Sequence, residues 1–154
     1  MIEIGKKAPD FTLADQDGKV HTLSDYVGSY VLIYFYPKDD TPGCTKEACA
    51  IRDDYSVFEK AGIVVFGISK DTSASHKKFA EKYNLPFTLL ADTDRKVITA
   101  YDAVKEIFGV SGTKRISYLI GPDGKIVKVY PKVDPSEHAQ EILADFAALK
   151  KEKK

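Results

Sequence analysis

Two unbroken apolar runs constrain the fold of this chain more than any other feature of its sequence. Residues 30–36 read YVLIYFY and residues 63–69 read IVVFGIS, and both runs are rich in β-branched and aromatic side chains. Runs of this length and composition are typical of strands that are buried on both faces. Such strands need covering layers on both sides, which indicates an α/β domain.

The segments around these runs predict the covering helices and further strands. Residues 44–60 place apolar side chains at three- and four-residue steps, which is the helical period. Capping and turn residues predict a second helix from Thr72 or Ser73 to about Tyr83 and a final helix from 135–136 through 149. The remaining expected elements are strands at 10–14, 20–23, 88–91, 116–120 and 126–130 and a short helix at 96–101.

The order of these elements predicts the architecture. Strand, helix, strand, helix, strand, strand and helix, preceded by a hairpin that turns at Asp17-Gly18, fits a thioredoxin-like fold. We therefore expect a central mixed β-sheet flanked by helices, with an added N-terminal β-hairpin. The chain has 154 residues, 44% of them hydrophobic, and contains no linker or internal repeat, so we expect a single domain over 1–154.

Charge and hydropathy exclude several classes of partner. The 23 Lys and Arg residues balance the 23 Asp and Glu residues, so the charge gives no reason to expect nucleic acid or an anionic membrane. No apolar run approaches the roughly 20 residues that a membrane span needs. Residues 1–9 are too polar for a signal peptide, so we expect a cytoplasmic protein.

Two cysteines, Cys44 and Cys49, are too few for a disulfide framework and are not needed for the stability of a domain of this size. Residues 36–50 read YPKDDTPGCTKEACA, in which Thr41 is a suitable helix N-cap and Pro42 a suitable first helical residue. Cys44 then lies in the first turn, where unpaired backbone N–H groups and the helix dipole favour a thiolate. The alternative is a small buried apolar side chain.

The two aspartates before the helix bear on this interpretation. A carboxylate close to the Cys44 sulfur would oppose the thiolate form, because like charges repel. We therefore expect Asp39 and Asp40 to point to solvent.

Cys49 lies five residues after Cys44. On a regular helix this spacing places the two Cα atoms roughly 8–9 Å apart, whereas a disulfide tolerates up to about 7 Å. Cys49 is therefore either a residue of the apolar helix face or one half of a redox pair whose first helical turns unwind on oxidation. The spacing leaves both readings open.

Several familiar sites are excluded by the residues that the chain lacks. It has no Cys-x-x-Cys pair of the thioredoxin type and no glycine-rich phosphate loop. His21, His76 and His138 show no ligand spacing for zinc, and we expect each to lie at the surface or to have its hydrogen bonds satisfied. Since no histidine base is expected near Cys44, a papain-like protease is also disfavoured.

The segment around Cys44 resembles a known family. The pattern Pro37-x-x-x-Thr41-x-x-Cys44 is similar to the peroxiredoxin signature, and TPGCTKEAC resembles the bacterioferritin-comigratory or peroxiredoxin Q branch. APDFTL near the start, residues 64–69 followed by Asp71, and Arg115 ahead of ISYLIGPDGK also resemble segments of that family. The resemblance thus covers nearly the whole chain.

The resemblance implies roles for individual residues. Cys44 would be the peroxidatic cysteine, which attacks a peroxide and becomes a sulfenic acid. Thr41 would offer its hydroxyl to the peroxide, and Arg115 would place a permanent cation beside the thiolate. Pro37 would shield the site from water. Glu47 would orient the arginine, with an exposed helix glutamate as the alternative.

The resemblance also implies the rest of the cycle. Cys49 would be the resolving cysteine that forms an intramolecular disulfide with Cys44, and thioredoxin or a glutaredoxin-like dithiol protein would reduce that disulfide. The expected activity is reduction of hydrogen peroxide and organic hydroperoxides to water and alcohols, with no cofactor, no metal and a monomer as the working unit. A redox sensor and a general thiol–disulfide oxidoreductase are the competing hypotheses.

Overall fold

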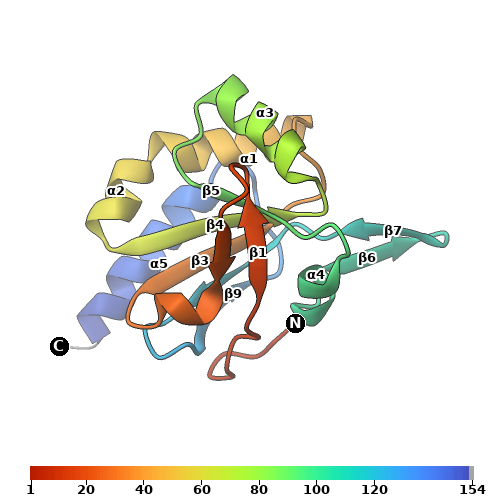
Figure 1. Cartoon of the computed structure of the whole chain (residues 1–154). Coiled ribbons are helices and arrows are strands. Elements are labelled where there is room, and N and C mark those ends of the chain that lie inside the picture. Colours follow the sequence, from red (N-terminus) through yellow and green to blue (C-terminus); the bar gives the residue numbers. More distant parts are fainter. Residues whose placement is uncertain (153–154) are drawn as a thin grey trace.

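The computed structural model describes residues 1–152 and builds them around one seven-stranded mixed sheet (Figure 1). The strands of this sheet are β1 (Thr12–Asp15), β2 (Val20–Thr22), β3 (Tyr30–Phe35), β4 (Ile63–Ser69), β5 (Thr88–Ala91), β8 (Ile116–Ile120) and β9 (Ile126–Tyr130). Strands β6 (Val104–Ile107) and β7 (Val110–Thr113) form a separate two-stranded sheet. The helices are α1 (Pro42–Asp53), α2 (Tyr55–Lys60), α3 (Ser73–Tyr83), α4 (Lys96–Ala100) and α5 (His138–Glu152), with one 3₁₀ turn at Leu23–Tyr26.

The main sheet has the strand order β2-β1-β5-β4-β3-β8-β9. Strands β3, β4 and β5 run parallel, whereas β1 pairs with β5, β8 with β3 and β9 with β8 in antiparallel fashion. The hairpin of β1 and β2 occupies one edge of the sheet. The expected mixed sheet flanked by helices, with an added N-terminal hairpin, is confirmed.

Strand β3, which lies between β4 and β8, is buried along its whole length because its side chains alternate between two cores. Leu32 and Tyr34 pack in the core that also receives α1, α2, α3 and α5, through Ile51, Phe58, Phe79 and Ile142. Ile33 and Phe35 pack in the opposite core, with α4 and the N-terminal segment. Each fully buried side chain of this size stabilises the fold by about 1.5–3 kcal/mol, which explains the continuous apolar run.

The helix predicted over 44–60 is two helices in the structure. The chain breaks at Asp54 between α1 and α2, where its backbone leaves the helical region (φ −103°, ψ 8°). The final helix begins at His138 rather than at 135–136. The carboxylate of Asp134 accepts hydrogen bonds from the backbone N–H and the hydroxyl of Ser136, and this turn precedes the helix.

The hairpin of β6 and β7 was not predicted. It projects from the body of the molecule (Figure 1) and turns at Phe108-Gly109, where both residues have positive φ. At its base the backbone N–H of Lys114 donates to the carbonyl of Ala103 at 2.7 Å. Strand β7 of the hairpin ends at Thr113, and Arg115 follows two residues later, directly before β8.

Among the described residues, no helix combines the length and the apolar character that crossing a membrane requires.

Candidate active site

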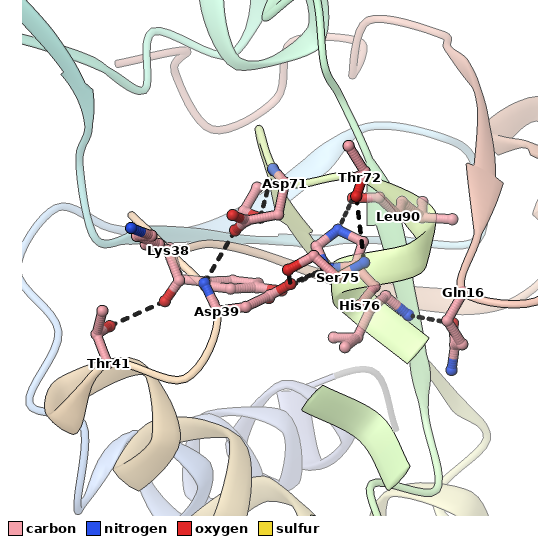
Figure 2. Close-up of polar contacts among 12 residues, drawn as sticks. Gln16, Lys38, Asp39, Thr41, Asp71, Thr72, Ser75, His76 and Leu90 are labelled. Atoms are coloured by element: carbon pink, nitrogen blue, oxygen red, sulfur yellow. Dashed lines mark hydrogen bonds and ion pairs between the residues drawn. The ribbon is translucent and has the colours of Figure 1, made fainter. Parts of the chain in front are cut away.

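The segment from β3 to α1 places Cys44 at a helix start. Thr41 precedes the helix in an extended conformation (φ −101°, ψ 156°), and Pro42 is the first helical residue, as predicted. The Thr41 side chain does not cap the helix, however. Its hydroxyl donates to the backbone carbonyl of Lys38 at 2.8 Å (Figure 2). Cys44 lies in the first turn with only 1% of its surface exposed.

The guanidinium of Arg115 links the Cys44 sulfur to a buried carboxylate. Nη2 donates to Sγ of Cys44 at 3.2 Å, and Nη1 donates to Oε1 of Glu47 at 2.8 Å. Burial opposes the charge of Arg115, but the hydrogen bond to Cys44 and the charge of Glu47 outweigh it, so the pKa of Arg115 is raised. The guanidinium beside the sulfur is therefore charged at neutral pH.

Glu47 is fully buried one helical turn after Cys44, which rules out the alternative of an exposed helix glutamate. Burial raises its pKa to about 7, although the charge and hydrogen bond of Arg115 act in the opposite direction. The carboxyl group thus changes its charge near neutral pH while it holds the arginine.

The lack of a side chain at Gly43 leaves room for the guanidinium of Arg115 beside Cys44, a role of Gly43 that the sequence did not predict. A Cβ atom built at Gly43 would lie 3.0 Å from Nη2 of Arg115, so a larger residue would push the guanidinium away from the first turn of α1. A glycine directly before a helix-start cysteine is the signal that could have indicated this close approach.

Pro37 is half-buried and lies on the wall of an open hollow beside the site. Lys105, Thr113, Lys114, Arg115 and Pro131 complete the lining. The structure thus brings Pro37 and Arg115 to the same hollow, at the base of the β6–β7 hairpin.

Cys49 is not brought to Cys44. Both cysteines are free thiols on the unbroken helix α1, and Cys49 is partly exposed. Regular helical geometry keeps their Cα atoms roughly 8–9 Å apart. Burial, together with the nearby charge of Asp53, raises the pKa of the Cys49 thiol, and Arg52 lowers it by less. Cys49 is therefore mostly a thiol at neutral pH.

The prediction that Asp39 points to solvent is wrong. Its carboxylate is buried against α3 and accepts a hydrogen bond from Tyr36 Oη at 2.6 Å. It accepts a second one from Ser75 Oγ at 2.8 Å (Figure 2). It also pairs with Nδ1 of His76 at 2.7 Å. Asp40 does point to solvent, where it forms an ion pair with Lys82. Neither carboxylate contacts the sulfur of Cys44.

The three histidines are buried and hydrogen-bonded, as expected. Among residues 1–152, the ligand atoms of Asp39, Asp71 and His76 lie within 4.8 Å of one another, as a metal site would require. These side chains already bond to one another or to neighbouring donors, so no free ligand set is available to an ion.

Comparisons with known proteins bear on what this site does. The sequence model of the AhpC/TSA family matches residues 4–129 of this chain. The peroxiredoxin Bcp of Bacillus subtilis is 45% identical over 146 residues, which cover 92% of this chain and 93% of that protein. The chloroplastic peroxiredoxin Q of rice, Oryza sativa subsp. japonica, is 46% identical over 149 residues, which cover 96% and 68% of the two chains.

Two solved structures are similar over nearly the whole chain. PrxQ of Xylella fastidiosa superposes with a TM-score of 0.92 at 33% identity and covers 96% of this chain and 97% of its own. The bacterioferritin comigratory protein of Xanthomonas campestris, studied for its alkyl peroxide reduction activity, gives a TM-score of 0.89 at 34% identity, with 95% and 98% covered.

Proposed function

Since this chain belongs to the AhpC/TSA family and is a thiol peroxidase of the Bcp and peroxiredoxin Q branch, we propose that Cys44 attacks the peroxide and that Cys49 resolves the product. The single observation that carries this assignment is the contact of Arg115 with Cys44. A fixed cation at hydrogen-bond distance favours the thiolate, which is the nucleophilic form.

In the first step the Cys44 thiolate attacks the terminal oxygen of a hydroperoxide. An S–O bond forms, the O–O bond breaks, and the leaving alkoxide or hydroxide takes up a proton to become an alcohol or water. Cys44 is then a sulfenic acid. Arg115 faces the charge that moves from sulfur to the leaving oxygen, so it stabilises the transition state.

Thr41 and the start of α1 receive the peroxide. The hydroxyl of Thr41 uses its proton on the carbonyl of Lys38, so toward substrate it offers only lone pairs. A hydroperoxide carries one proton on its terminal oxygen, which such an acceptor binds. The backbone N–H groups of Gly43 and Cys44 add donors, because at the start of a helix they have no partner within it.

In the second step the Cys49 thiol loses its proton and its sulfur attacks the sulfenic sulfur of Cys44. The S–S bond forms, the S–O bond breaks, and the leaving hydroxide takes up a proton and departs as water. Because α1 is continuous from Pro42 to Asp53 and the spacing exceeds disulfide reach, the first turns of α1 must unwind for this step. A dithiol protein of the thioredoxin or glutaredoxin type then exchanges with the disulfide and restores both thiols.

The proposal also covers the oligomeric state, the cellular location and the role of Pro37. Since the disulfide forms within one chain, no second subunit is needed, and we assign a monomer built as a single domain. Two free thiols suit a reducing compartment, which supports a cytoplasmic location. The half-buried Pro37 limits the access of water to the hollow beside Arg115.

Steady-state peroxide reduction with thioredoxin, thioredoxin reductase and NADPH tests the proposal. The wild-type protein is expected to turn over hydrogen peroxide and organic hydroperoxides, and Cys44→Ser to have no activity. Cys49→Ser is expected to consume about one equivalent of peroxide and then stop. Full turnover by Cys49→Ser would refute the role of Cys49, and a wild-type rate equal to that of a free thiol would favour a redox sensor over an enzyme.

A further inference from the structure

A buried polar network holds the loop that precedes α1. His76 on α3 has no exposed surface, and the Asp39 side chain in the loop is almost completely enclosed. Figure 2 shows the two side chains in contact, with Ser75 and Asp71 beside them. A buried charge is costly unless it is paired and hydrogen-bonded, so a network of this kind at the edge of a reactive site requires an explanation.

Both ring nitrogens of His76 form hydrogen bonds. Nδ1 faces Oδ2 of Asp39 at 2.7 Å, and Nε2 faces the backbone carbonyl of Leu90 at 3.0 Å. Each contact is a hydrogen bond, so one proton lies between Nδ1 and Oδ2 and a second lies on Nε2, which faces a carbonyl acceptor. The carboxylate of Asp39 accepts from two hydroxyl groups in addition, which fits an ionised group. Asp39 and His76 therefore form a buried hydrogen-bonded pair.

A second carboxylate fixes the backbone of the same loop. Oδ2 of Asp71 accepts from the backbone N–H of Asp39 at 2.9 Å and from the hydroxyl of Ser69 at 2.6 Å. The N–H of Asp39 and the carbonyl of Lys38 belong to one planar peptide unit, so fixing the N–H also fixes the direction of the carbonyl. That carbonyl accepts the hydroxyl proton of Thr41.

We propose that Asp39, His76 and Asp71 are positioning residues for peroxide reduction, which fix the peptide between Lys38 and Asp39 and through it the orientation of the Thr41 hydroxyl. The hydrogen bond to His76 anchors the Asp39 side chain, Asp71 anchors its backbone, and the Lys38 carbonyl directs the proton of Thr41 away from the substrate. The inference rests on the proposed function, because it concerns how Thr41 receives the peroxide.

Two reactions of the Cys44 sulfur, with peroxide and with iodoacetamide, distinguish a positioning role of Asp39 from a general role in stability. Peroxide needs an oriented Thr41, whereas alkylation of Cys44 by iodoacetamide does not. Asp39→Asn keeps the shape of the side chain but replaces one of its two acceptor oxygens with an amide donor, so the contacts to Tyr36, Ser75 and His76 cannot all be kept. We expect its stopped-flow rate with hydrogen peroxide to fall about 10- to 100-fold, as misplacement of a positioning group costs, while its alkylation rate stays within about twofold of wild type.

Asp40→Asn is the matched control. The neighbouring carboxylate makes the same kind of contact with α3, through Lys82, but it lies at the surface, where an ion pair contributes little. Its rate with peroxide is expected to remain within about twofold of wild type. In a Thr41→Val background, Asp39→Asn should cause no further loss, because its effect is transmitted through the Thr41 hydroxyl.

Three results would overturn the proposal: an unchanged peroxide rate in Asp39→Asn, equal losses in the peroxide and alkylation rates, or losses that add to those of Thr41→Val. If Asp39→Asn does not fold, Ser75→Ala removes one hydroxyl donor from the same carboxylate. It should show the same selective loss at about two- to fivefold, the value of one hydrogen bond of modest strength, and an unselective or absent loss would contradict the proposal. A slow reaction of the wild type itself would instead refute the proposed function.

Discussion

Cys44 and Arg115 are in direct contact although 71 residues separate them in the chain, with Nη2 of the arginine 3.2 Å from Sγ of the cysteine. The contact joins the first turn of α1 to the residue before β8, and the buried carboxylate of Glu47 holds the other side of the same guanidinium. A planar group with two fixed partners has little freedom to turn. The cation that stabilises the thiolate is therefore preorganised.

Arg115→Lys tests whether this geometry matters beyond charge. Lysine keeps the positive charge but cannot donate to Cys44 and Glu47 at once through a planar fork. We expect the rate of Cys44 with hydrogen peroxide, measured by stopped flow, to fall about 10²- to 10³-fold. Arg52→Lys, on the same helix α1 and bonded to the carbonyl of Tyr83, is the control and should change the rate by less than about twofold. A wild-type rate in Arg115→Lys would show that charge alone suffices.

Glu47 should make the stability of the protein depend on pH. The folded state holds the Glu47 proton up to about pH 7, whereas the unfolded chain releases it near its ordinary pKa of 4.5. Unfolding between these values therefore releases a proton, so the contribution of Glu47 to stability is greatest below pH 4.5 and falls as pH rises to about 7. The expected loss is on the order of 3 kcal/mol.

Urea unfolding of wild type and Glu47→Gln across this pH window measures the effect. The free energy of unfolding of wild type relative to Glu47→Gln should fall as pH rises. The exposed Glu81 supplies the control: the free energy of unfolding of wild type relative to Glu81→Gln should not fall in this way as pH rises. If the difference rose with pH instead, the ion pair with Arg115 would outweigh the burial of the carboxylate.

Gly67 on β4 provides a test of core packing behind the site. A Cβ atom there would lie 2.6 Å from Cζ of Tyr34 and 2.9 Å from Cδ2 of Leu89. We expect Gly67→Ala to lower the free energy of unfolding by about 1–3 kcal/mol, because a filled core resists an added methyl group. Gly112→Ala on β7 meets nothing closer than 3.7 Å and should stay within about 1 kcal/mol of wild type. Equal stabilities for the two variants would contradict the packing argument.

Oxidation should reduce the helix content of the protein. The disulfide between Cys44 and Cys49 cannot form on a regular helix, so the first turns of α1 must unwind as it closes. Far-UV circular dichroism should therefore lose helical signal after peroxide and regain it after reduction. Cys49→Ser should show no such loss, since it cannot close the disulfide. Identical spectra for reduced and oxidised wild type, with the disulfide present, would disprove the unwinding.

The buried strands were predictable because burial on both faces leaves a continuous apolar run. The predicted strands at 63–69 and 116–120 coincide with β4 and β8, which are largely buried in this way. The predicted strands at 88–91 and 126–130 are only partly buried and coincide with β5 and β9. The hairpin of β6 and β7 gave no such signal. Its strands are short, and it turns at Phe108-Gly109 although a bulky residue rarely adopts positive φ.

The error at Asp39 has a different cause. Two consecutive aspartates after a strand look like solvent-exposed loop residues, and the partner of the first one lies 37 residues further along the chain. A signal was nevertheless present in α3. His76, Phe79 and Ala80 share one helix face, which indicates a buried histidine, and a buried histidine needs acceptors. Local sequence could not say which acceptors would meet it.

The central claim is that Cys44 is oxidised first and that Cys49 resolves it within the same chain. Trypsin cleaves after Lys46, between the two cysteines, so peptides 39–46 and 47–52 report on them separately. After one equivalent of hydrogen peroxide, mass spectrometry of wild type should find these peptides joined by a disulfide in a monomeric protein that has lost two hydrogens. Cys49→Ser should carry a sulfenic acid on Cys44, trapped with dimedone. A disulfide between two chains, or dimedone on Cys49 with Cys44 still a thiol, would contradict the account.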